Sequence, residues 1–122
     1  MANILIMNQR VIESKTLRVI LEKSGHQVTE INDSTKGIEI IQSRVFDLIM
    51  YDITMQGTDG FKFLEIVPKA LRKRTVIVSP ETSIAPLGII EQLARCKGAM
   101  GALKQPINST ELLQFVENIS VL

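Results

Sequence analysis

The sequence predicts an α/β fold, a single doubly wound sheet of five parallel strands with five helices. Short continuous apolar runs alternate along the chain with longer stretches in which apolar residues recur at helical spacing. This alternation is typical of strand–helix–strand units around a parallel sheet. The chain has 122 residues, which is enough for one domain with a core of its own. We therefore expect one domain over residues 1–122.

Apolar runs indicate where the five strands lie. The strands are expected at residues 4–7, 27–31, 46–51, 75–78 and 99–103. The third run, Phe46-Asp47-Leu48-Ile49-Met50-Tyr51, is apolar enough to be a central strand that helices cover on both faces. Asp52 stands at its carboxyl end.

Helical spacing, capping residues and helix breakers place the helices between these strands. The helices are expected over residues 11–23, 38–42, 60–67 and 83–94 and after residue 108. Asn32 or Asp33 can cap the second helix. Asn108, with Glu111 three residues later, resembles a capping box for the last helix.

Composition excludes several classes of function. The 14 Lys and Arg residues balance 13 Asp and Glu residues, so no overall field favours direct binding of nucleic acid or of an anionic membrane. No apolar stretch approaches the ~20 residues of a membrane span and no signal peptide is visible, so we expect a cytoplasmic protein. The only cysteine is Cys96, and the only histidine is His26, which we expect in a solvated connector. Disulfides, cysteine zinc sites and histidine-based catalytic triads are therefore excluded.

Polar residues directly follow four of the expected strands. In an open parallel sheet the loops at the carboxyl ends of the strands form the binding crevice, so we expect these residues to lie together. They are Asn8, Gln9, Asp52, Ser79, Lys104 and Gln105. Taken alone, an Asp after an apolar strand is more often a loop or capping residue than a reactive group, and Ser79 can be a strand-end hydroxyl that bonds to backbone.

Several segments, in this order along the chain, resemble the receiver domains of two-component response regulators. The strand ending at Asp52 and the loop Met55-Gln56-Gly57-Thr58-Asp59-Gly60 are similar to the family's phosphoacceptor strand and loop. Val78-Ser79 resembles the strand whose final hydroxyl follows the phosphoryl group, and 98–106 resembles the stretch that ends in Lys-Pro. The resemblance implies a flavodoxin-like, CheY-like (βα)5 fold, a signalling role rather than an enzymatic one, Asp52 as the phosphoacceptor and Ser79 as the switch hydroxyl.

The chain departs from the family at the positions that hold Mg²⁺. Members that autophosphorylate bind the ion with an acidic pair, the acceptor Asp and the backbone carbonyl two residues beyond it, here Thr54. Asn8 and Gln9 stand at the acidic-pair positions. Removing one unit charge at ~4 Å forfeits up to ~4 kcal/mol at an effective dielectric of 20, and half of that weakens binding roughly thirtyfold. The resemblance therefore implies, at most, weak Mg²⁺ binding at Asp52 and Thr54.

The family's lysine and its reporting aromatic residue are also replaced. Gln105 fills the lysine position, and Lys104 comes one residue earlier. Because adjacent side chains of an extended segment point to opposite faces, we do not expect Lys104 to replace the missing lysine. Ala102 stands where the family has Tyr or Phe. We also expect Asn8 to donate a hydrogen bond to Asp52 and so to hold the pocket in one state without a metal.

The resemblance supports two functions. The first is an atypical receiver that acts as a protein-interaction module through its fourth helix (83–94), fifth strand (99–103) and fifth helix, with weak or no Mg²⁺-dependent phosphorylation. The alternative is a working receiver that a histidine kinase phosphorylates at Asp52. The sequence also allows a second copy of the chain as a partner, in a homodimer. A small-ligand site or an enzyme is a remote third reading, because the loop after the first strand has no glycine to cradle a phosphate.

Overall fold

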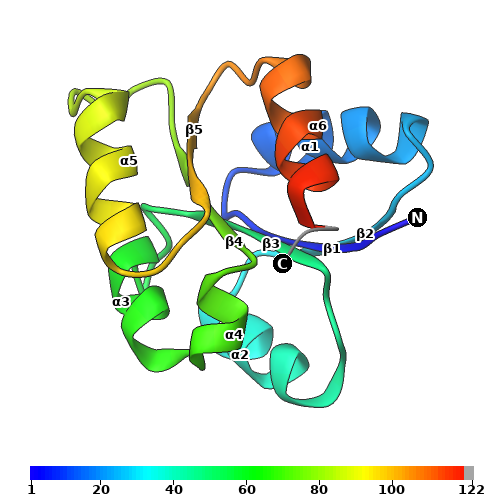
Figure 1. The fold of residues 1–122 in the computed structure, drawn as a ribbon, viewed down its shortest axis with the longest axis horizontal. Helices are drawn as coiled ribbons and strands as arrows, with labels where there is room; N and C mark the ends of the chain where they lie inside the picture. Colours follow the sequence, from blue (N-terminus) through cyan, green and yellow to red (C-terminus); the bar gives the residue numbers. More distant parts are fainter. Residues whose placement is uncertain (120–122) are drawn as a thin grey trace.

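Five parallel strands form one sheet in the order β2-β1-β3-β4-β5, which confirms the predicted fold class (Figure 1). The computed structural model describes residues 1–119. The strands are β1 (Asn3–Met7), β2 (Gln27–Ile31), β3 (Leu48–Asp52), β4 (Thr75–Ser79) and β5 (Gly101–Lys104). The helices are α1 (Val11–Lys23), α2 (Ser34–Ser43), α3 (Gly60–Ile66), α4 (Lys69–Arg72), α5 (Leu87–Cys96) and α6 (Ser109–Asn118).

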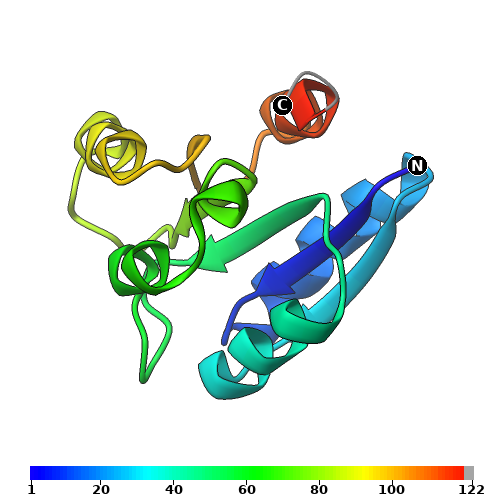
Figure 2. The same cartoon turned by 60° about the horizontal axis from the view of Figure 1, so that its bottom comes forward.

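Helices cover both faces of the sheet, so the central strands are buried throughout. On one face, α1 and α6 contribute Leu17, Leu21 and Leu112 to a cluster with alternate residues of the strands. The helices α2, α3 and α5 lie on the other face (Figure 2). There α3 and α5 contribute Phe63 and Ile90 to a second cluster, and α2 packs its partly buried isoleucines against it. Every residue of β3 and β4 is buried. This burial on both faces explains why these two strands read as unbroken apolar runs in the sequence.

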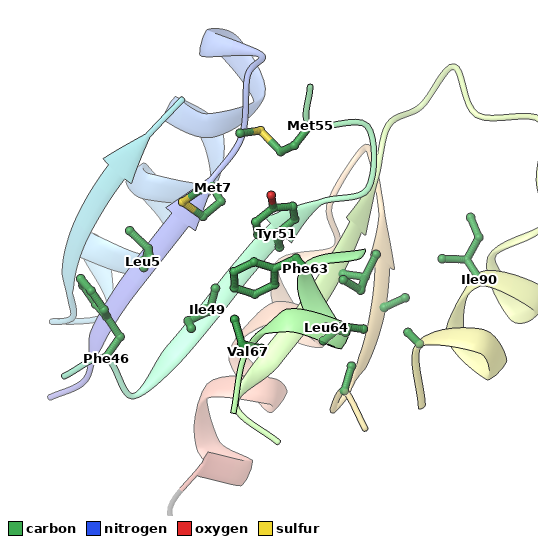
Figure 3. Close-up of a cluster of buried hydrophobic side chains, with 14 residues drawn as sticks. Leu5, Met7, Phe46, Ile49, Tyr51, Met55, Phe63, Leu64, Val67 and Ile90 are labelled. Atoms are coloured by element: carbon green, nitrogen blue, oxygen red, sulfur yellow. The ribbon is translucent and has the colours of Figure 1, made fainter. Parts of the chain in front are cut away.

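A stacked aromatic pair lies at the centre of the second cluster. The rings of Tyr51 and Phe63 are 4.1 Å apart at an angle of 20° (Figure 3). The Tyr51 hydroxyl donates a hydrogen bond to the carbonyl of Thr58 in the loop that follows β3. Burial raises the pKa of the Tyr51 phenol well above its usual value, and the charges of Asp59 and Asp52 raise it further. The phenol therefore stays protonated and holds the loop as a donor.

The side chain of Met7 in β1 fills the space that a side chain at Gly37 of α2 would need. A Cβ atom on Gly37 would lie 2.0 Å from Cε and 2.1 Å from Sδ of Met7. Met7 is fully buried in the cluster between the sheet and the helices. A side chain at position 37 would therefore have to displace the end of the buried Met7 side chain.

The structure differs from the predicted helices in two places. A short helix, α4, follows Pro68, which ends α3 as expected because proline cannot continue a helix. The next helix begins at Leu87 and not at Ser83. Pro86 occupies its N-cap position, so the preceding residues remain in the loop after β4. The fifth predicted helix is therefore α6, and the fourth is α5.

None of the helices in the described part of the chain is long and apolar enough to cross a membrane.

His26 is half-buried and bonded rather than solvated, so that expectation was wrong. Its Nδ1 accepts a hydrogen bond from the backbone N–H of Ala2 at 3.1 Å. Burial lowers the pKa of His26 below the usual 6.5, and the charge of the N-terminus lowers it further. The unfolded chain then binds the proton more readily than the folded chain does. The stability that neutral His26 contributes is present above pH 6.5 and is lost as the pH falls through the lower, folded-state pKa.

We expect the protein to lose stability as the pH falls and His26 becomes protonated. Replacing His26 with a hydrogen-bond acceptor that does not titrate should reduce this loss. The urea midpoint of the wild-type chain should fall between about pH 7.5 and about pH 5.5. In His26→Asn the fall should be smaller, because the amide oxygen can accept from Ala2 and takes no proton. Equal falls in the two proteins would show that His26 does not contribute to it.

Candidate functional site

The strand register brings four of the predicted site residues to the same edge of the sheet. Met7 pairs with Tyr51, so Asn8 follows β1 beside Asp52, the last residue of β3. Ser79 ends β4 and pairs with Lys104, after which Gln105 leaves β5. Asn8, Asp52, Ser79 and Gln105 are all less than a tenth exposed. The predicted grouping of polar residues after the strands is present in the structure, as a buried row.

One oxygen of Asp52 is bonded and the other is free. Oδ1 accepts hydrogen bonds from the backbone N–H of Thr54 at 2.9 Å and from its hydroxyl at 2.8 Å. Oδ2 is buried without a hydrogen-bond partner among residues 1–119. Thr54 therefore fixes the orientation of the carboxylate, and Oδ2 is the oxygen that is not used in a hydrogen bond.

Asn8 does not bond to Asp52, contrary to expectation. Its Oδ1 accepts a hydrogen bond from the backbone N–H of Arg10 at 2.7 Å. This bond identifies Oδ1 and Nδ2 of the side-chain amide, because only the oxygen can accept. Its Nδ2 is buried, and hydrogen bonding with Asn8 partly opposes the rise that burial causes in the pKa of the neighbouring Glu13 carboxyl. The expectation failed because the backbone of the following loop binds the amide oxygen and directs the side chain.

Gln9 ties the loop after β1 to the loop after β3. Its Oε1 accepts a hydrogen bond from the backbone N–H of Gln56 at 3.0 Å. On the other side of the same peptide segment, the hydroxyl of Ser34 donates to the carbonyl of Gln56 at 3.0 Å. Gln56 is therefore bonded from two elements, and Gln9 supplies a direct link between the two loops that border Asp52.

We expect Gln9→Ala to loosen the loop after β3 while the fold remains intact. The lost bond is neutral and exposed, so the amide of Gln56 should exchange its hydrogen roughly three- to tenfold faster. The amide of Met55, which bonds to the carbonyl of Asp52 at 3.2 Å, serves as the internal control. Hydrogen exchange followed by NMR measures both, and an unchanged Gln56 rate would show that Gln9 does not hold the loop.

The far end of the row carries amide and hydroxyl groups in place of a cation. Nε2 of Gln105 and Oγ of Ser79 are buried without partners in the described chain. The backbone N–H of Gln105 donates to the carbonyl of Ser79 at 2.9 Å, which holds the two residues side by side. Nζ of Lys104 donates instead to the carbonyl of Ser83 at 3.1 Å. The neighbouring lysine thus binds the loop after β4, in agreement with the expected opposite directions of the two side chains.

One carboxylate of the site, that of Glu13, was not predicted from the sequence. Burial raises the pKa of Glu13, Arg10 opposes this rise, and the charges of Asp52 and Glu81 add to it. Arg10 Nη1 lies 3.7 Å from Oε2 of Glu13. A signal was present, because Glu13 lies in the first turn of a helix that starts at this edge of the sheet. Its charge therefore acts on the same pocket as Asp52.

The residues at this edge do not fit a divalent cation. The amide oxygens of Asn8 and Gln9 already accept backbone N–H groups, and the other polar atom of the Asn8 side chain is an N–H donor, which cannot bind a cation. Mg²⁺ requires oxygen ligands in near-octahedral geometry, and the Asp52 carboxylate offers one unbonded buried oxygen. Within residues 1–119, no group of three or more His, Cys, Asp or Glu residues is arranged to hold a metal.

Comparisons with known proteins agree with this architecture. Protein PilH of Pseudomonas aeruginosa is 27% identical over an alignment of 127 positions, gaps included, which covers 98% of each chain. Fimbriae Z protein of Salmonella typhimurium is 32% identical over 79 residues, which cover 63% of this chain and 37% of that protein. Among solved structures, chemotaxis response regulator CheY4 of Vibrio cholerae is 27% identical with a TM-score of 0.74, covering 98% of each chain. The Francisella response regulator 1452 receiver domain, at 20% identity, has a TM-score of 0.83 over 98% of this chain and 96% of that one.

The family match covers nearly the whole chain. The model of the response regulator receiver domain matches residues 4–117. This span includes β2 to β5 in full, β1 from its second residue, and the buried row at the carboxyl ends of the strands. The chain therefore belongs to the response regulator receiver domains of two-component systems.

Proposed function

We propose that this receiver is atypical and acts as a cytoplasmic protein-interaction module, with weak or no Mg²⁺-dependent phosphorylation. The observation that carries the proposal is the state of the two amide oxygens at the acidic-pair positions. Asn8 and Gln9 accept backbone N–H groups at 2.7 and 3.0 Å, so both side chains serve the local structure. Neither supplies the negative charge that a divalent cation requires beside Asp52.

The charges around Asp52 support the same proposal. Phosphoryl transfer depends on cations that neutralise the charge of the transferring group. Lys104 donates to Ser83, and Arg10 is paired with Glu13. The negative charges of Glu13 and Glu81 act in the same region. An anionic phosphoryl donor would therefore approach carboxylates without a compensating cation.

The partner surface that we propose is the groove between α5, β5 and α6. It has a volume of about 350 Å³. Its lining residues are Leu87, Glu91, Arg95, Ala102, Leu103, Glu111, Gln114, Phe115 and Asn118. Ala102 is part of this lining, and its small side chain leaves open space between the helices. Apolar residues rimmed by charges are the composition of a protein-binding surface.

The experiment is incubation with acetyl phosphate and Mg²⁺, followed by intact-mass spectrometry and amide chemical shifts. Asp52→Asn is the matched control, because it keeps the shape of the side chain and removes the nucleophile. We expect no adduct of one phosphoryl group in either protein and no Mg²⁺-dependent shift around Asp52. A stable, Asp52-dependent adduct at modest Mg²⁺ concentration would overturn the proposal.

The second candidate function is phosphorylation of Asp52 by a histidine kinase. The unbonded Oδ2 of Asp52 and the unbonded hydroxyl of Ser79 favour it, because both groups remain available at the end of the sheet. The same incubation distinguishes the two functions when a kinase-derived phosphohistidine donor replaces acetyl phosphate. An adduct that forms only with the phosphohistidine donor would favour this second function over the first.

A further inference from the structure

A cleft near the amino ends of β4 and β5 is lined mainly by basic side chains. It has a volume of about 270 Å³. The lining residues come just before these two strands in the chain, whereas Asp52 ends β3, so the cleft lies at the opposite edge of the sheet from Asp52. The whole chain has a net charge of only +1, yet the described lining of this cleft includes four cations and no carboxylate. The lining residues are Lys69, Arg72, Lys73, Cys96, Lys97 and Gly98.

Two of the four cations hold the walls of the cleft in place. Nε of Arg72 donates to the carbonyl of Val67 at 3.1 Å, and its Nη2 donates to the carbonyl of Glu65 at 3.2 Å. Nζ of Lys97 pairs with Oε1 of Glu65 at 2.7 Å. The stem of Arg72 also packs against Gly98, because a Cβ atom on the glycine would lie 3.4 Å from Cβ and Cδ of the arginine. These contacts tie α4 and the end of α5 to α3, so the walls are formed without a ligand.

The other two cations, Lys69 and Lys73, are exposed and unpaired. Within residues 1–119, neither ammonium group has a hydrogen bond or an ion pair. The backbone is helical from Lys69 to Lys73, so the two side chains are neighbours one turn apart, with Cβ atoms about 5–6 Å from each other. Like charges at this spacing repel each other. An anion that binds both ammonium groups would relieve this repulsion.

The kind of donor that is free favours a phosphate over a carboxylate. A carboxylate is recognised best by the two parallel donors of a guanidinium group, but Arg72 already uses two of its donors on backbone carbonyls. An ammonium group is a point charge with rotatable donors, which suits the several oxygens of a phosphate. At ~30 Å³ per water molecule, the cleft has room for roughly nine waters, enough for two linked phosphate groups.

We propose that this cleft binds a free small molecule through a diphosphate group. Lys69 and Lys73 donate to the phosphate oxygens from α4, and the remaining donors of Lys97 face the same anion from the end of α5. The proposal goes beyond the interaction module and does not depend on it. The cleft shares no lining residue with the groove between α5, β5 and α6, and it lies away from Asp52.

The test uses inorganic pyrophosphate as the probe, without Mg²⁺ and at constant ionic strength, and amide chemical shifts of the whole chain as the readout. We expect saturable shifts at residues 69–73 and 96–98, with a dissociation constant of about a millimolar or below. Inorganic phosphate carries less charge and should bind at least roughly tenfold more weakly. The double variant Lys69→Gln, Lys73→Gln should also bind pyrophosphate at least roughly tenfold more weakly.

The double variant Lys15→Gln, Lys23→Gln is the matched control. It removes the same net charge from two exposed positions of α1, outside the cleft, so the affinity for pyrophosphate should change by less than about twofold. Well-dispersed spectra establish that both double variants are folded.

Cys96 provides an independent readout, because it is the only cysteine, is exposed and lines the cleft. Bound pyrophosphate should slow the reaction of its thiol with the anionic disulfide 5,5′-dithiobis(2-nitrobenzoate). This slowing should occur in the wild type and in the Lys15, Lys23 variant, and it should be lost in the Lys69, Lys73 variant.

Three results would each overturn the proposal. The first is the absence of saturable local shifts with pyrophosphate. The second is an equal affinity in the two double variants, which would mean that only net charge matters. The third is binding of the chain to vesicles that contain an anionic phospholipid without any response to pyrophosphate, which would mean that the basic residues serve a membrane surface.

Discussion

Replacing Asn8 with Asp, Gln9 with Glu and Gln105 with Lys is expected to make Asp52 a cation-dependent phosphoacceptor. Asn8→Asp and Gln9→Glu keep the side-chain shapes and the oxygens that accept from Arg10 and Gln56. Two restored carboxylates, at roughly thirtyfold each, should strengthen Mg²⁺ binding by about three orders of magnitude. The lysine should increase the rate of phosphoryl transfer by a factor on the order of 10²–10³.

Mg²⁺ binding and phosphoryl transfer are measured separately. Mg²⁺ titrations followed by amide shifts give the affinity in the double variant, and intact mass after acetyl phosphate gives the transfer rate in the triple variant. The triple variant with Asp52→Asn added should bind Mg²⁺ less tightly and should form no adduct. An unchanged Mg²⁺ affinity in the folded double variant would show that something other than the two missing charges prevents cation binding.

Truncating the stacked ring of Phe63 is expected to have the largest effect on stability. Phe63 is fully buried and its ring lies 4.1 Å from that of Tyr51, centre to centre. Phe63→Ala removes this contact and leaves a cavity between α3 and β3, which should cost about 3–5 kcal/mol of the free energy of unfolding. Urea denaturation followed by circular dichroism measures the loss.

Phe61→Ala is the control for this change, because it makes the same truncation on the same helix at a partly buried position. We expect its cost to be less than half that of Phe63→Ala. Equal losses in the two variants would mean that the general packing of α3, and not the buried stack, sets the stability.

The sheet and the grouping of the site were predictable because they depend on local patterns. Apolar runs at β3 and β4 reflect burial on both faces, and parallel strands must end at a common edge, so Asp52 and Ser79 had to lie close together. The start of α5 was misplaced by four residues because Pro86 can stand inside a first turn or at the N-cap, and helical spacing does not distinguish these positions.

The orientations of the site's amides were not predictable from the chain alone. Whether Asn8 presents its oxygen or its nitrogen to Asp52 depends on where the backbone N–H of Arg10 lies after the chain has turned into α1. Glu13 enters the site for a similar reason, since the angle between α1 and the sheet decides which of its residues face the edge. These features arise from the packing of elements, which residue spacing does not record.

The packing of Met7 against Gly37 has a consequence for how this chain can vary among relatives. Gly37 has no room for a methyl group while the thioether of Met7 fills the space in front of it. A relative with alanine at position 37 should therefore carry a shorter side chain at position 7, and the two positions should change as a pair. A change at only one of these two positions should be disfavoured.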